Sequence, residues 1–169
     1  QLFEIARTGS LSFSQPSQID LTNGNFTFHP NPNTFGEVTY EIQLFDNGAY
    51  YGDNENASEK LSFKIEVLPV IDGAPYVTNA NTSVNQQTTD GLVIKPNEVD
   101  GEEVTFFKIT DIQKGKLFLN NGTTEILNSS FVTATEVAKG LKFTPDKDSK
   151  ETGSFLVQAS LSNDNEGLG

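Results

Sequence analysis

Residues 28–43 read FHPNPNTFGEVTYEIQ, and residues 143–158 read FTPDKDSKETGSFLVQ. Each stretch has an aromatic residue two places before a proline, a second aromatic residue ten places after that proline, and a glutamine at its end. A further echo lies upstream, where residues 9–13 (GSLSF) resemble residues 115–119 (GKLFL). A spacing of about 115 residues is the length of an ordinary domain and not that of a solenoid repeat. The sequence therefore predicts two copies of one domain.

The two copies contain different parts of the repeated domain. The residues from Ala74 to Lys114 precede the echo in the second copy, whereas only eight residues precede it in the first. We therefore expect the first domain to lack its N-terminal strands and the second to lack its last strand. The chain is interpreted as a window onto a longer tandem array of β domains, with residues 1–71 in the first and residues 72–169 in the second.

The local patterns predict short strands. Apolar and polar residues alternate over Leu61–Leu68, with Leu61, Phe63, Ile65 and Val67 on one face. The same alternation marks residues 39–44, and further strands are expected at residues 104–109, 117–119, 140–143 and 154–159. Asn-Gly and Asp-Gly turns separate these runs. This pattern is typical of an all-β fold built from two β-sandwiches.

Two features interrupt the strands. Thr133, with Glu136 three residues later and Gly140 as a stop, predicts one or two helical turns.

The residues from Leu68 to Pro75 (LPVIDGAP) place two prolines around an Asp-Gly pair. Because proline limits backbone freedom, we expect a short and rather stiff connector between the two domains.

Composition sets further bounds. The chain has 169 residues, 35% of them hydrophobic, with 13 Phe and no Trp, Met or Cys. The lack of Cys excludes disulfides and thiolate metal sites. A net charge of −12 disfavours nucleic acid and anionic lipid as partners. The sequence has no apolar run of about 18 residues, so we expect no membrane insertion of this segment.

The order of these motifs resembles that of bacterial-type cadherin-like tandem repeats. Residues 45–59 and 63–75 resemble the closing part of such a repeat, in which an Asp-x-Gly turn precedes an Asn/Ser/Glu-rich loop and a last strand runs into a Val-Asn-Asp-x-Pro linker. The second copy, with DGE at residues 100–102, GKL at 115–117 and GLKFTP at 140–145, is similar to cadherin-like and chondroitin-sulfate-proteoglycan-type repeats. The resemblance covers most of the chain.

That resemblance implies immunoglobulin-like β-sandwiches, an extracellular or cell-surface location, and calcium at domain junctions. Two positions depart from the family pattern. The usual linker Asn-Asp is Ile71-Asp72 here, and the usual second acid of the Asp-x-Asp-Gly-Asp motif is Glu102. One oxygen ligand is therefore missing from the linker.

Calcium takes six to eight oxygen ligands in irregular geometry, so loops rich in Asp, Asn and Glu suit it. The expected ligands are Asp46, Asp53, Glu59 and Asp72 from the end of the first domain, and Asp100 and Glu102, beside Glu103, from the second. A metal held by both sets would fix the angle between the domains. The alternative is that these acids are solvated turn residues.

Two more kinds of site follow from short motifs. Asn-x-Ser/Thr sequons predict glycosylation if the protein is a secreted eukaryotic one, although a chain rich in Asn, Ser and Thr has such matches by chance. Tyr50 and Tyr51 follow a turn, where they would stack on a sugar or anchor a protein, or else cover the end of their own domain. The five sequons begin at Asn25, Asn56, Asn81, Asn121 and Asn128.

Catalysis finds little support in the sequence. The single histidine, His29, has no cysteine or second histidine as a partner, and Glu102 and Glu103 are expected on opposite sides of a strand. We therefore expect that the chain is not an enzyme.

The predicted function is a structural and adhesive spacer in a large extracellular repeat protein, stiffened by calcium. Its partners would be neighbouring repeats, other extracellular proteins or glycans, and copies of itself in fibres. A glycosylated filament subunit and a carbohydrate-binding module of a secreted enzyme are the alternatives.

Overall fold

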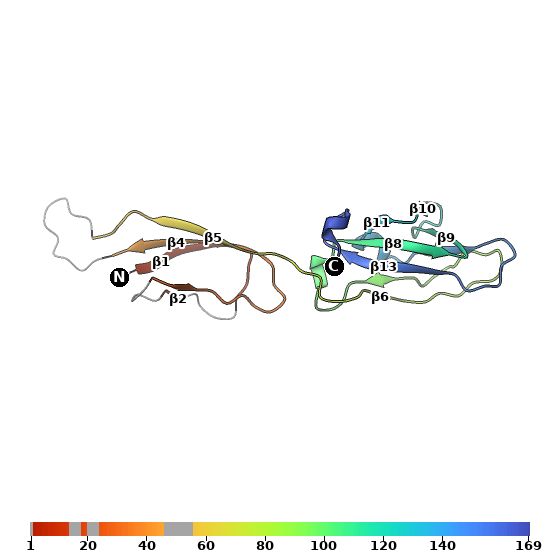
Figure 1. Cartoon of the computed structure of the whole chain (residues 1–169), viewed down its shortest axis with the longest axis horizontal. Coiled ribbons are helices and arrows are strands. Elements are labelled where there is room, and N and C mark those ends of the chain that lie inside the picture. Colours follow the sequence, from red (N-terminus) through yellow and green to blue (C-terminus); the bar gives the residue numbers. More distant parts are fainter. Residues whose placement is uncertain (1, 14–17, 20–23, 46–55) are drawn as a thin grey trace. The chain divides into compact units, whose positions relative to one another are not determined.

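The computed structural model describes residues 2–13, 18–19, 24–45 and 56–169 (Figure 1). The chain divides into two compact units, Gln1–Pro69 (unit 1) and Val70–Gly169 (unit 2). All strand pairs are antiparallel. The helical segments of the described residues are one α-helical turn and two short 3₁₀ turns. The predicted all-β fold is therefore confirmed.

Unit 1 contains a three-stranded antiparallel sheet in the order β1-β4-β5. The strands β2 and β3, which lie between β1 and β4 in the sequence, form a separate two-stranded sheet. The β4–β5 register places Tyr40 opposite Phe63 and Val38 opposite Ile65. Its strands are β1 (Leu2–Gly9), β2 (Gln18–Ile19), β3 (Phe26–Thr27), β4 (Gly36–Leu44) and β5 (Leu61–Val67).

Aromatic rings fill the core of unit 1. Tyr40 is fully buried and stacks on Phe63 at a centroid distance of 5.4 Å, while Phe26 meets both rings edge-on at 5.0 and 5.1 Å. Such edge-to-face contacts stabilise the core beyond the area that they bury. Leu11 and Val38 complete the buried cluster.

Unit 2 contains two three-stranded sheets, in the orders β11-β8-β13 and β10-β9-β12, and a β6-β7 pair. Figure 1 shows β8 and β13 running side by side along the unit. The strands are β6 (Tyr76–Val77), β7 (Ile94–Lys95), β8 (Phe106–Gln113), β9 (Gly115–Phe118), β10 (Glu125–Ile126), β11 (Ser130–Thr133), β12 (Lys142–Pro145) and β13 (Ser154–Ser160).

A single apolar cluster lies at the centre of unit 2. Both three-stranded sheets contribute to it, because strands alternate inward and outward side chains. Phe107 and Ile109 come from β8, Leu117 from β9 and Ile126 from β10. The helical segments of unit 2 are α1 (Ala134–Val137), η1 (Gly101–Glu103) and η2 (Asn165–Gly167).

The predicted helical turn is confirmed. The Oγ1 atom of Thr133 accepts a hydrogen bond from the Glu136 N–H at 3.3 Å, which caps α1. Val137, on the inner side of this turn, is fully buried in the core of unit 2.

Two predictions on side-chain direction were wrong. Leu61 was expected to face inward with Phe63, but 61% of it is exposed, because it stands at the beginning of β5 beyond the core. Glu102 and Glu103 were expected on a strand. They lie instead in η1, a 3₁₀ turn, in which Glu103 is buried and Glu102 is exposed.

Candidate functional site

The connector enters unit 2 against a pair of acidic residues. The Asp72 N–H donates to the Asp100 Oδ1 at 2.6 Å, and the Val70 N–H donates to the Glu103 Oε2 at 2.9 Å. Both acids come from the η1 turn, in which Glu103 N–H donates to the Asp100 carbonyl. The turn therefore presents two carboxylates to the backbone of the connector. We call Asp100 and Glu103 the carboxylate pair.

Close packing holds the connector in place. A Cβ atom on Gly73 would stand 2.4 Å from the Asn97 Nδ2, so only glycine fits at that position without a shift. Asn97 also shapes the turn itself, because its Oδ1 accepts from the Val99 N–H and its carbonyl accepts from the Gly101 N–H. One loop thus positions both the connector and the carboxylate pair.

The carboxylate pair is buried. Asp100 is 2% exposed and Glu103 is 9% exposed. The Oδ2 atom of Asp100 is buried and has no hydrogen-bond partner among the described residues. A buried carboxylate oxygen without a partner loses its hydration without compensation, which is costly. This oxygen is therefore the described atom best suited to accept a cation.

The other predicted calcium ligands fall into two groups, those outside the described residues and those that are exposed. Asp46 and Asp53 lie outside the described residues. Glu59, in unit 1, is exposed, and so are Asp72 and Glu102 in unit 2. Within the described part of the chain, no group of three or more His, Cys, Asp or Glu side chains could hold a metal.

Asp72 and Asp100 do meet, but through the backbone N–H of Asp72 and not through its carboxylate. Glu103 was not among the chosen ligands, although it stands next to Glu102. Adjacent glutamates give no sequence signal that separates the buried one from the exposed one. The difference arises from the 3₁₀ turn, which directs Glu103 toward the connector.

All five sequon asparagines are exposed. Two of them already use their side chains. Asn121 accepts from the N–H groups of Thr123 and Thr124 and donates to the Thr124 hydroxyl, and Asn128 accepts from the Ile112 N–H at 2.9 Å. Glycosylation of any of the five stays a prediction.

Tyr50 and Tyr51 lie outside the described residues, so sugar binding through them also stays a prediction. His29 is exposed and follows β3 closely.

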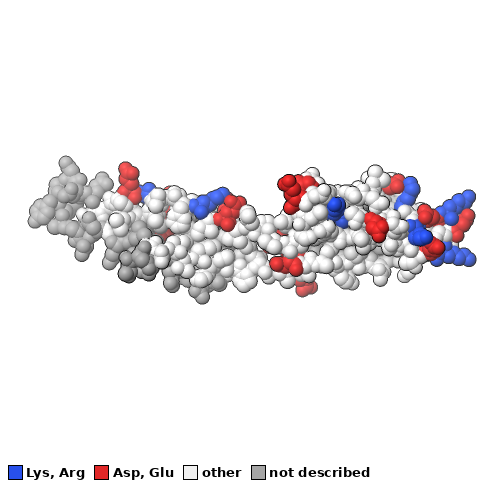
Figure 2. All heavy atoms as spheres, in the orientation of Figure 1, with Lys and Arg blue, Asp and Glu red and all other residues white. Residues whose placement is uncertain are grey.

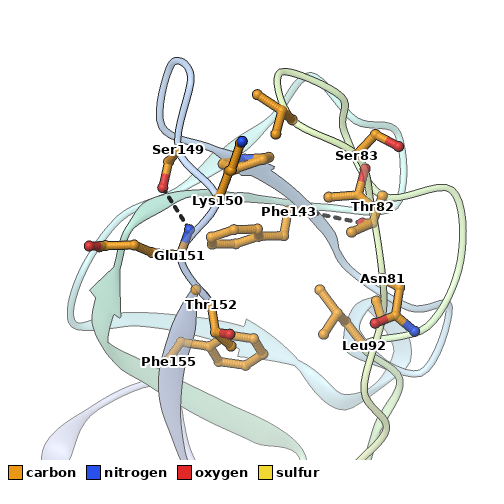
Figure 3. A pocket seen from close by; sticks show the side chains of 15 residues that line it. Asn81, Thr82, Ser83, Leu92, Phe143, Ser149, Lys150, Glu151, Thr152 and Phe155 are labelled. Atoms are coloured by element: carbon orange, nitrogen blue, oxygen red, sulfur yellow. Dashed lines mark hydrogen bonds between the residues drawn. The ribbon is translucent and has the colours of Figure 1, made fainter.

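A second feature of unit 2 is a groove of about 700 Å³. In Figure 3 the segment with Asn81, Thr82 and Ser83 forms one wall, and the segment from Ser149 to Thr152 forms the other. Apolar side chains line it between these walls, namely Val84, Leu92, Phe143, Pro145 and Phe155. We call this feature the edge groove.

Acidic and basic side chains both occur on the surface of unit 2. On the face of unit 2 that Figure 2 shows, acidic side chains are scattered and basic ones gather toward one end. The ion pairs are exposed, as between Lys114 and Glu151 at 2.6 Å, so they contribute little to stability.

Comparison of the chain with protein-family models, with curated proteins and with solved structures found no match. Among the described residues, no helix has the length and apolar character that crossing a membrane requires.

Proposed function

We propose that the chain is a segment of a large extracellular repeat protein and serves as a structural and adhesive spacer. In this proposal each unit is an immunoglobulin-like, cadherin-like β-sandwich. The two compact units, the antiparallel sheets in each and the repeated sequence of about 115 residues support it.

The observation that carries the proposal is that the carboxylate pair accepts hydrogen bonds from the backbone of the connector. A spacer transmits force through its connectors, so the path of the backbone between units has to be fixed. In unit 2 two buried carboxylates bind two backbone N–H groups of the connector, at Val70 and Asp72. Hydrogen bonds to a charged acceptor are roughly twice as strong as those between neutral groups.

Calcium binding at the carboxylate pair belongs to the same proposal. The buried Asp100 Oδ2 supplies one oxygen ligand, and the exposed Asp72 and Glu102 lie nearby in the sequence of the connector and of η1. Since the described residues form no group of three ligands, further oxygens would come from other groups or from water. When bound, calcium would compensate for the hydration that the Asp100 carboxyl group loses on burial.

Isothermal titration of the full chain with calcium tests this proposal. We expect binding heat and a rise of the melting temperature, both reversed by a chelator. Asp100→Asn removes the charge and should abolish the binding. Asp90→Asn is the matched control, because Asp90 is exposed in a loop of the same unit. Absence of heat, together with a melting temperature that chelation leaves unchanged, would refute calcium binding.

A further inference from the structure

One edge of β13 is open. In the sheet order β11-β8-β13, β8 covers the other edge. The Ser160 carbonyl accepts from the Thr105 N–H on the β8 side, whereas the Leu161 N–H donates to Gly167 on the opposite side. Because successive backbone groups of a strand alternate in direction, the amide groups of Phe155 and Val157 face the edge away from β8. Such an edge is a template for another strand.

The chain already turns back along this edge. Leu168 pairs with Ser160 in an antiparallel bridge, and the Gln158 side chain donates to the Gly169 carbonyl at 2.6 Å. Asp164 holds the turn between them by accepting from the Ser162 hydroxyl and from the Glu166 N–H. The direction and the register of a strand on this edge are therefore set by Leu168.

The edge groove lies where such a strand would run. Gly153 and Phe155, at the beginning of β13, line it on one side, and residues 80–84 line it on the other (Figure 3). In an antiparallel register that begins at the Ser160–Leu168 bridge, a strand reaches the groove about six residues beyond Leu168. Its inward side chains would then cover Leu92, Phe143 and Phe155.

Unit 1 shows the same arrangement with the edge filled. The repeat matches Tyr40 and Ile42 of β4 with Phe155 and Val157 of β13. Both strands have an antiparallel partner on one side, β1 in unit 1 and β8 in unit 2. On its other side β4 pairs with β5, whose Phe63 and Ile65 alternate into the core. Among the described residues of unit 2, no strand takes the place of β5.

We propose that the open edge of β13 and the edge groove form the binding site for an antiparallel β-strand of the β5 type, joined in cis to Gly169. Its alternate apolar side chains fill the groove, and its backbone pairs with Phe155 and Val157. This assignment does not depend on calcium or on the spacer function, because its residues differ from those of the connector.

The test extends the full chain after Gly169 by one threonine and then the seven residues of β5, Leu61–Val67. This register places the leucine opposite Val157, as Leu61 stands opposite Ile42 in unit 1. We expect amide exchange at Phe155 and Val157 to slow by about tenfold or more and the melting temperature of unit 2 to rise.

The matched control omits the threonine. The same seven residues are then shifted by one position, which turns the apolar face away from the groove. This control should give no protection. Val84→Lys, in the wall of the groove, should abolish the protection in the first extension, and Leu127→Lys, an exposed apolar residue outside the groove, should leave it intact.

The proposal is overturned if both registers protect equally or if neither does, while circular dichroism shows the fold to be intact. It is also overturned in its assignment to a strand in cis if the free β5 peptide, at the concentration of the protein, protects as strongly as the fused one.

Discussion

Phe143 shows at the scale of single residues how the packing of one ring can require a glycine beside it. Its ring lies against two glycines, so that a Cβ on Gly153 would stand 2.1 Å from its Cζ and a Cβ on Gly115 would stand 2.5 Å from the same atom. Neither glycine has the positive φ that would require glycine for backbone reasons. Space for the Phe143 ring accounts for Gly153, and at Gly115 the Thr144 carbonyl oxygen, 2.4 Å from the position of a Cβ, is a second obstacle.

Gly153→Ala should therefore destabilise unit 2 by about 1–3 kcal/mol, through overpacking against the Phe143 ring. Urea unfolding of the full chain measures the change. In a Phe143→Leu background, where the ring is absent, the cost of Gly153→Ala should fall markedly. Equal costs in the two backgrounds would show that the ring is not the obstacle.

The buried acids mark a limit of sequence reasoning at this scale. The sequence indicated Asp100 as a ligand through its Asp-Gly-Glu motif, but its burial depends on the connector packing above it, residues 70–73. Glu102 was chosen because it stands at the second acidic position of the resembled motif, whereas the 3₁₀ turn buries its neighbour Glu103. Contacts between segments some 30 residues apart decided both outcomes.

At the scale of elements, alternation and capping were sufficient for much of the fold. The strands β4, β5 and β13 fall where period-two patterns placed them, and α1 begins at the predicted Thr133 cap. The ends of the strands could not be predicted in the same way. Leu44 and Leu61 keep the apolar pattern but are more than half exposed, since the core of unit 1 does not reach that far along β4 and β5.

The turn after β13 makes a prediction on pH. The hydrogen bond from the Ser162 hydroxyl lowers the pKa of Asp164 below its ordinary value of 3.8, with a further contribution from the Glu166 N–H. A carboxylate with a lowered pKa stabilises the folded state above its unfolded pKa, and this contribution is lost as the pH falls through the folded pKa. Asp164→Asn should therefore be less stable than the original chain at neutral pH.

The difference between the two proteins should shrink below about pH 4 and vanish once the carboxyl group is protonated in the folded state. Thermal unfolding over a series of pH values measures it. A difference that stays constant down to strongly acidic pH would show that the charge of Asp164 has no part in the turn.

At the scale of the whole molecule, the chain divides into two compact units, each with antiparallel sheets. Each unit has its own buried cluster, around Tyr40 in unit 1 and around Phe107 and Leu117 in unit 2. The repeated motif predicted this division without any structure, because identical spacing implies identical strands. The open edge of β13 was expected only as a missing last strand, whereas its groove and the returning residues at Leu168 required coordinates.

Hydrogen exchange with mass spectrometry on the full chain tests the central claim of two separately stabilised β units most directly. Val38→Ala removes a buried side chain of unit 1, and Leu117→Ala removes one of unit 2 at a cost of about 2–5 kcal/mol. We predict faster exchange confined to residues 1–69 in the first variant and to residues 70–169 in the second. Faster exchange throughout the chain in either variant would contradict the account, because it would reveal one cooperative core.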